Sequence, residues 1–492
     1  MRRIETLVLV ANLLAFCSLV VRLPPAIRWM RHWVGIALVI AIVHVLLEGA
    51  RWQMAPAYTL TGVFVVILVM QSNTAAGGFG KHPGLSWLAV GLGVCSLVIA
   101  SALPILLPVF HFPQPGGPYA IGTVTYHWTD VDRPEVFSAD PQARRELMVQ
   151  IWYPATSDPA ASRAPYIEDA GALAVALAQL HHLPEFSFGH LKYVRTNGIP
   201  SAPIAQNLPS YPVLIFVEGI TGFRQMNTFQ VEALVAHGYI VAAIDQPYVA
   251  AAVVFPDGRQ VAGLSKDQMN GLIQQSISPT EPTPQLNGRL FPDGIIPYLA
   301  HDAIFTLDQL TTLNHDDPNG ILTGRLALQH VGVFGVSLGS IVASEACRLD
   351  ARLRACLLMD APMPANVVEG GLQQPSMWIT RDAETMQREG WGQVDIDQHQ
   401  TTMRAAFERL VGDGYFVQVP GMYHANLTDI SAWSPLFSWL GIAGPITGPR
   451  AHRIVNAYSL AFFDQQLKGQ PEALLAGSSA EYPDVRFEAR QP

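Results

Sequence analysis

A serine stands where an apolar run meets a helical pattern. Residues 335–339 read Gly-Val-Ser-Leu-Gly and follow a run rich in valine. Flanking glycines permit a sharp strand-to-helix turn that strains Ser337 and exposes its hydroxyl. The same turn aims the N–H of Leu338 toward negative charge developing on a substrate carbonyl. A glycine-rich turn with a helix-capping serine would share this sequence, but the position after a buried strand favours a nucleophile.

A serine nucleophile needs a base, and the base needs an acid that orients it. His424 follows the last predicted strand of the sheet, and we predict that it is the base. Two aspartates compete for the third role. Asp360 ends the run after the nucleophile, and Asp382 follows the next run. Both follow strand ends, so spacing leaves the choice open, and either gives the order serine, acid, histidine of α/β-hydrolases.

The second oxyanion donor is expected in residues 218–224, the loop after the first buried strand. We predict that the N–H of Ile220 is that donor. Glu218 is unexpected there, because a carboxylate pointing inward would oppose the negative charge of an oxyanion. We expect Glu218 either to face away into a hydrogen bond or to pair with Arg224.

The elements that must position these residues alternate between strands and helices. Helical patterns cover 224–237, 299–313 and 339–349. Strands are expected at 119–128, 147–153, 211–219, 239–245, 330–337, 353–360, 375–380 and 415–420. Short apolar runs alternating with helices predict a mainly parallel sheet covered on both faces, an α/β-hydrolase fold over residues 113–492. Residues 255–297 and 383–410 interrupt this alternation of strands and helices. Either segment could cover the site or be a surface excursion, and we expect the second to be helical.

The first 110 residues are far more apolar than the rest. Four apolar stretches, 4–21, 33–47, 52–71 and 85–110, approach or reach the length that crosses a bilayer. Arg2 and Arg3 before the first stretch also fit a cleaved signal peptide, but no clear cleavage site follows. We therefore predict an uncleaved module of about four transmembrane helices over residues 1–112.

The basic residues of this module leave its orientation nearly balanced. One side would carry four of them and the other three: Arg22, Arg28, Arg31 and Lys81 against Arg2, Arg3 and Arg51. Residues 110–132 contain no Lys or Arg, which favours an extracytoplasmic body under the positive-inside rule. His44, Glu48 and Arg51 have the spacing of one helix face. They predict either an intramembrane proton or ion site or, as we favour, a local polar cluster at the helix end.

Composition excludes several classes of protein. Charged residues make up 14% of the 492, against about 25% in ordinary soluble domains. Residues 111–492 carry 23 basic and 37 acidic side chains without a basic run, which argues against a nucleic-acid partner. Four cysteines exclude a disulfide-rich scaffold. We find no metal-ligand spacing, phosphate-binding loop or dinucleotide fingerprint, so no metal or cofactor is expected. The oligomeric state is left open.

Residues 145–465 resemble the platelet-activating factor acetylhydrolase family of serine esterases. The resemblance is most specific in four pieces: 216–246, 306–313, 335–339 together with 353–363, and 421–429. It implies Ser337 as nucleophile, Asp360 as acid and His424 as base, with oxyanion donors at Ile220 and Leu338, and so favours Asp360 over Asp382. It also implies hydrolysis of short-acyl esters or phospholipids.

The chain departs from that family in four ways. Glu218 and Val336 stand where the family commonly has histidine, and the animal enzymes lack the N-terminal module. Residues 380–384, which contain Asp382, look more like those α/β-hydrolases that use an acid at this position. We therefore predict a membrane-anchored serine ester hydrolase whose partners are a lipid or small ester and the membrane. One alternative is an acyltransferase or polyester depolymerase using the same three residues. Another is a non-enzymatic membrane sensor or transport module with a degenerate hydrolase domain, which Glu218 favours.

Overall fold

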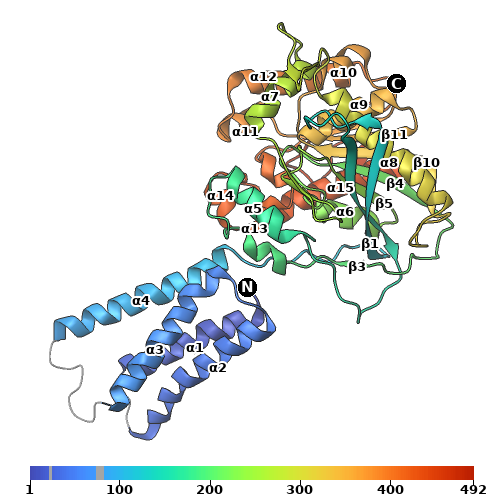
Figure 1. Cartoon of the computed structure of the whole chain (residues 1–492). Helices are drawn as coiled ribbons and strands as arrows, with labels where there is room; N and C mark the ends of the chain where they lie inside the picture. The colour runs from blue at the N-terminus through green and yellow to red at the C-terminus, as the bar shows by residue number, and fades with distance from the viewer. Residues whose placement is uncertain (22–24, 74–82, 492) are drawn as a thin grey trace. The chain divides into compact units, whose positions relative to one another are not determined.

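The computed structural model describes residues 1–21, 25–73 and 83–491 (Figure 1). It divides into two compact units. One is Met1–Phe110 with Trp433–Leu436, and the other is His111–Ala432 with Phe437–Pro492. Arg22 and Lys81, which enter the orientation argument, lie outside the described residues.

The first unit is helical. Its α-helices are α1 (Arg3–Val20), α2 (Trp33–Leu47), α3 (Ala55–Asn73) and α4 (Pro83–Leu106), with 3₁₀ turns at Pro25–His32 and Trp52–Met54. Within the residues that the structure describes, four helices are long and apolar enough to cross a membrane, by length and composition. The fourth ends earlier than the predicted 85–110, because Pro108 disfavours helical conformation at the residue before it.

The polar cluster of this unit differs from the predicted arrangement. The helix α2 ends before Gly49, whose φ of 79° is left-handed. Arg51 therefore lies beyond the helix, and the prediction that it shares one helix face with His44 and Glu48 is wrong. Arg51 instead donates hydrogen bonds of 2.7 and 3.0 Å to the two carboxylate oxygens of buried Glu5. This pairing fits the local polar cluster that the sequence favoured.

The second unit is built on a ten-stranded sheet with the order β14-β13-β12-β11-β10-β4-β5-β2-β1-β3. The six strands from β13 to β5 are mutually parallel, and β14 and β2 run antiparallel to them at either side. The strands are β1 (Ala120–Pro134), β2 (Arg144–Ala155), β3 (Gly198–Pro200), β4 (Tyr211–Val217), β5 (Ile240–Asp245), β10 (Leu326–Val336), β11 (Leu353–Met359), β12 (Ser376–Thr380), β13 (Gly414–Gln418) and β14 (Arg486–Arg490). The mainly parallel sheet is as predicted.

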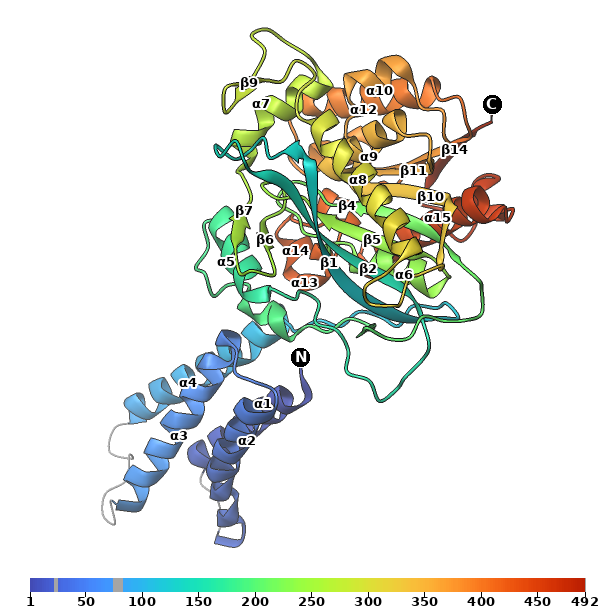
Figure 2. The same ribbon diagram turned by 45° about the vertical axis from the view of Figure 1, so that its right-hand side comes forward.

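Helices cover both faces of this sheet (Figures 1 and 2). On one face the core includes α8 (Ile296–His315), α9 (Leu338–Leu349) and α12 (Gln393–Glu408), and on the other α6 (Thr228–Ala236) and α15 (Gly448–Lys468). Burial on both faces explains why the central strands read as continuous apolar runs rather than alternating ones. This is an α/β-hydrolase fold, as the sequence predicts.

The remaining elements lie between these. They are α5 (Ala170–Leu180), α7 (Lys266–Ile277), α10 (Ala365–Gly370), α11 (Ala383–Arg388), α13 (Ile430–Trp433), α14 (Leu436–Trp439), 3₁₀ turns at Gly189–Tyr193, His424–Leu427 and Ala473–Leu475, and the strand pairs β6 (Ala252–Val254) with β7 (Gln260–Ala262) and β8 (Gln285–Leu286) with β9 (Arg289–Leu290). The helical prediction for 383–410 is confirmed by α11 and α12. Segment 255–297 also holds a helix, α7, which begins at a capping box formed by Ser265 and Gln268.

Candidate active site

The predicted site residues follow neighbouring strands of the sheet. In the register of β10, Val336 pairs with Met359 of β11 and Gly335 pairs with Val217 of β4. Ser337, Asp360 and residues 218–222 therefore leave the sheet at the same edge. The N–H of Ser337 donates a 2.9 Å hydrogen bond to the carbonyl of Met359, which ties the serine turn to the neighbouring strand.

Ser337 adopts the strained conformation that its sequence predicts. Its φ of 59° and ψ of −128° place it in the left-handed region, immediately before α9. Glycine is needed at two positions where the end of β4 and the loop after it approach the Ser337 turn. A Cβ at Gly339 would overlap the carbonyl oxygen of Val217, and one at Gly219 would lie 3.1 Å from the Cβ of Ser337. The chain therefore packs the loop after β4 directly against the serine.

His424 and Asp360 are in direct contact. His424 Nδ1 lies 2.5 Å from Asp360 Oδ2, and because a carboxylate only accepts, Nδ1 carries the proton. The hydroxyl of Thr380 donates a 2.9 Å hydrogen bond to Asp360 Oδ1. Burial raises the pKa of Asp360, but the charge of Arg381 and the hydrogen bond from His424 outweigh it and leave that pKa well below its usual range. The carboxylate stays ionised, while the His424 side chain is 28% exposed and open to a substrate.

Asp382 is engaged elsewhere. It caps the N-terminus of α11, where its Oδ1 accepts a 2.8 Å hydrogen bond from the N–H of Thr385. Its other oxygen accepts a 2.8 Å bond from Arg486 Nη1. These partners account for both oxygens of Asp382. The structure thus brings Asp360, and not Asp382, to His424.

The two predicted oxyanion donors are backbone groups at loop and helix starts. Among the described residues, the N–H groups of Ile220 and Leu338 have no protein acceptor. The loop that carries Ile220 is fixed on either side. The N–H of Thr221 donates to Val249 O at 2.8 Å, and the N–H of Gly222 donates to Gly219 O at 2.9 Å. Available N–H groups on a fixed loop and at a helix N-terminus are suited to bind developing negative charge.

The Glu218 carboxylate is hydrogen-bonded to the segment that follows β5. It is fully buried, and its Oε1 accepts a 2.8 Å hydrogen bond from the N–H of Gln246. Burial, and then the nearby charges of Asp245 and Asp302, raise the pKa of Glu218 well above its usual range. Of the two expected arrangements, the structure has the hydrogen bond and not the pair with Arg224. The raised pKa favours the neutral form of Glu218, which would add no negative charge beside the predicted oxyanion donors.

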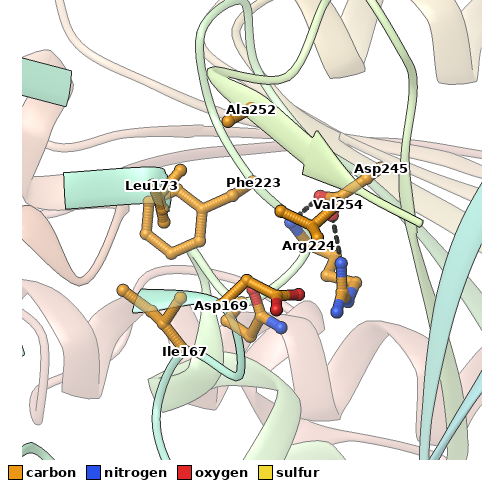
Figure 3. A pocket seen from close by; sticks show the side chains of 9 residues that line it. Ile167, Asp169, Leu173, Phe223, Arg224, Asp245, Ala252 and Val254 are labelled. Atoms are coloured by element: carbon orange, nitrogen blue, oxygen red, sulfur yellow. Dashed lines mark hydrogen bonds and ion pairs between the residues drawn. The ribbon is translucent and has the colours of Figure 1, made fainter. Parts of the chain in front are cut away.

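Arg224 lines a small cavity, together with Phe223 and Asp245 (Figure 3). It pairs with Asp245 through both its N–H and its guanidinium, and Glu168 accepts a further 3.1 Å bond from it. The cavity has a volume of about 20 Å³, which is room for one water molecule, and Asp169 lines it beside Arg224. It is too small for a substrate, and Ser337 is not among its lining residues. We interpret it as part of the support of the loop after β4.

Three residues around the site were not predicted from the sequence. Arg381 contacts Asp360, and Glu389 and Trp391 from the segment between α11 and α12 contact Arg381. Arg381 directly follows the run 375–380, so the rule that chemistry follows strand ends could have singled it out.

A further unpredicted residue is Asp429, which connects the loop that contains His424 to the N-terminus of α6. Its carboxylate accepts hydrogen bonds of 2.9 and 3.1 Å from the N–H groups of Thr228 and Phe229. A carboxylate at a helix N-terminus is a common cap, but here it comes from a distant segment and is not visible as a local pattern. In the described part of the chain, no three His, Cys, Asp or Glu side chains are grouped to hold a metal ion.

Comparisons with known proteins agree with this architecture. The family described as platelet-activating factor acetylhydrolase, isoform II, matches residues 107–267. A probable 1-alkyl-2-acetylglycerophosphocholine esterase of Arthroderma benhamiae is 23% identical over 435 residues, 81% of this chain and 99% of that protein. The platelet-activating factor acetylhydrolase of Gallus gallus is 21% identical over 379 residues, 73% of this chain and 84% of its own.

A solved structure supports the same conclusion. The ferulic acid esterase of Streptomyces cinnamoneus superposes with a TM-score of 0.59 and 26% identity, covering 77% of this chain and 99% of its own. An esterase neighbour, the acetylhydrolase relatives and the sheet with helices on both faces all point to one assignment. The chain is similar to the platelet-activating factor acetylhydrolase family, whose model matches residues 107–267, and is a carboxylic ester hydrolase.

Proposed function

We propose that the chain is a membrane-anchored serine esterase in which Ser337 is the nucleophile, His424 the base and Asp360 the acid. The observation that carries the proposal is the 2.5 Å contact between His424 Nδ1 and Asp360 Oδ2, at the sheet edge where the strained Ser337 turn begins. Residues 113–492 form the catalytic domain in this proposal. Because the chain is an ester hydrolase and the buried Glu218 carboxylate accepts a hydrogen bond from the N–H of Gln246, the non-enzymatic alternative is set aside.

The proposed mechanism uses these groups in sequence. With Nδ1 held protonated by Asp360, the Nε2 atom of His424 accepts the Ser337 proton while Oγ attacks the ester carbonyl. The N–H groups of Ile220 and Leu338 bind the oxyanion. Collapse of the tetrahedral intermediate breaks the ester bond, and the proton on Nε2 passes to the departing alkoxide. Water then hydrolyses the acyl-enzyme by the same route.

The proposed substrates are short-acyl esters, including phospholipids. The names of the two relatives support this, since one is a probable 1-alkyl-2-acetylglycerophosphocholine esterase and the other a platelet-activating factor acetylhydrolase. The apolar helices support a site close to a bilayer, where such lipids are found. The sequence resemblance points to the same class.

Hydrolysis of p-nitrophenyl esters from acetate to palmitate by the full-length protein in detergent tests the proposal. We expect turnover that is greatest for short chains and absent in Ser337→Ala, with both proteins showing the same circular dichroism. Short-chain turnover that Ser337→Ala retains would refute the proposed nucleophile. Adding an alcohol acceptor separates hydrolysis from acyl transfer, because a transferase would form the new ester in preference to free acid.

We also propose that the four apolar helices span a membrane and that the catalytic domain is extracytoplasmic. The support is the absence of Lys and Arg from residues 110–132 together with the apolar helices. Exposed Ser157 of this domain offers a labelling site, since Cys347 and Cys356 are buried. Ser157→Cys in intact cells should react with a membrane-impermeant maleimide. Reaction only after permeabilisation would place the domain in the cytoplasm.

A further inference from the structure

The proposed catalytic acid is held by a buried arginine. Arg381 follows the end of β12, and its residue is 1% exposed. Its Nε lies 2.9 Å from Asp360 Oδ2 and 3.2 Å from Oδ1, so the guanidinium contacts both carboxylate oxygens. Oδ2 is also the atom that His424 contacts. One carboxylate oxygen is therefore shared between a fixed cation and the catalytic base.

The far side of Arg381 is connected to His424 as well. The guanidinium forms an ion pair with Glu389, and Glu389 Oε1 accepts a 3.1 Å hydrogen bond from the N–H of His424. Trp391 covers the guanidinium, with its ring centroid 4.4 Å from Arg381 Cζ and 6.1 Å from the imidazole centroid. Arg381 is thus at the centre of a closed set of contacts around the acid and the base.

We propose that Arg381 is a positioning residue of the esterase, which orients Asp360 and limits how strongly that carboxylate stabilises the protonated form of His424. The inference rests on the proposed function, because it requires that His424 act as the base and Asp360 as its partner. The geometry supports the inference, since Arg381 Nε and His424 Nδ1 both contact Asp360 Oδ2, so this one oxygen connects the guanidinium to the imidazole.

The charges around His424 set the direction of the effect. Asp360 and Glu389 are acidic and favour the imidazolium, whereas the cation Arg381 disfavours it. His399 also lies nearby, on α12. Burial lowers the pKa of His399 to about 4, so it is neutral across the range of the assay. Removing the charge of Arg381 leaves the two acids unopposed, and His424 then becomes protonated at a higher pH.

The test is the pH dependence of kcat/KM for p-nitrophenyl acetate with full-length protein in detergent. In Arg381→Met we expect the midpoint of the acidic limb to rise by about one pH unit or more, the usual effect of a charge within 4–6 Å. Arg381→Lys keeps the charge and should keep the midpoint while lowering kcat. Arg486→Met is the matched control, because it removes another guanidinium paired to an aspartate, but one that is 63% exposed and bound to Asp382.

Several outcomes would overturn the inference. If Arg381→Met is folded and has a lower kcat, but the midpoint of its acidic limb is unchanged, then Arg381 has only a structural role. If Arg381→Met does not fold, Glu389→Gln takes its place. Removing this acid leaves the arginine unopposed, so the midpoint should fall, and an unchanged midpoint would refute the charge argument.

A failure of the proposed function would give a different experimental result. Full activity in Asp360→Asn would refute the proposed acid whatever Arg381 does. An inactive Asp360→Asn together with an unmoved midpoint in Arg381→Met would refute only the inference on Arg381.

Discussion

Replacing each of the two candidate acids by asparagine gives sharply different expectations. The described partners of the Asp360 carboxylate are donors: the imidazole Nδ1–H of His424, the Nε–H of Arg381 and the hydroxyl of Thr380. An amide NH₂ at this position would face one of those donors and favour the wrong tautomer of His424. We expect kcat of Asp360→Asn to fall about 10³- to 10⁴-fold, which corresponds to about 4–5 kcal/mol of transition-state stabilisation.

Asp382→Asn should have little effect on catalysis. Asparagine caps a helix N-terminus about as well as aspartate, so the bond from the N–H of Thr385 is kept. The lost ion pair with the exposed Arg486 contributes at most about 1 kcal/mol to stability. We expect activity within about twofold of the original protein, because neither partner of Asp382 touches His424.

Steady-state kinetics with p-nitrophenyl acetate measures both variants, and thermal melting in the same detergent confirms that each is folded. The reasoning fails if Asp382→Asn loses as much activity as Asp360→Asn. It also fails if folded Asp360→Asn keeps more than a tenth of the original kcat. Equal losses in two folded variants would mean that the contact between Asp360 and His424 does not identify the catalytic acid.

Three further predictions concern stability and the oxyanion loop. Gly339→Ala should abolish activity and lower the melting temperature, because its Cβ would overlap the carbonyl of Val217. As the control, Gly271→Ala lies in open space on α7 and should raise the free energy of unfolding by about 0.5–1 kcal/mol. A functional Gly339→Ala would contradict the packing. Burial raises the pKa of Glu232 to about 7, although hydrogen bonds from Asn197 act in the opposite direction. The contribution of protonated Glu232 to the free energy of unfolding is therefore fully present below pH 4.5. It is lost as the pH rises through 7, by up to about 3 kcal/mol. Melting temperatures from pH 5 to 8 should therefore shift in favour of Glu232→Gln as pH rises, and a constant difference between the two proteins would refute this. Because the raised pKa of Glu218 keeps that side chain neutral, Glu218→Gln should retain kcat/KM within about threefold at pH 7, and a hundredfold loss would show that its ionised form is needed.

Much of the fold follows from patterns that are strong in a single sequence. The central strands are buried on both faces, so each appears as an apolar run such as 211–217 or 353–359. Ser337 and His424 could be singled out because a parallel sheet gathers the residues after its strands at one edge. The sequence does not predict the α7 helix because only three of its buried residues, Met269, Leu272 and Ile277, are apolar, and so its apolar pattern is weak.

Other features depend on which side chains meet across the sheet. The contact between Arg381 and Asp360 follows from the pairing of β12 with β11, where Met359 lies opposite Ile379, and no spacing along the chain encodes it. The same holds for Asp382, which is indistinguishable from Asp360 by position until its side chain is seen capping α11. Arg51 was misplaced because Gly49 ends the helix before it.

Covalent labelling of Ser337 tests the central claim most directly. A fluorophosphonate reacts with a serine only when a base activates it, and the adduct stays on that residue. We predict that the full-length protein in detergent takes up one equivalent, that peptide mass mapping places it on Ser337, and that activity disappears in proportion. His424→Ala should react at least about a hundredfold more slowly. Uptake at another residue, or full esterase activity in protein completely labelled at Ser337, would contradict the account.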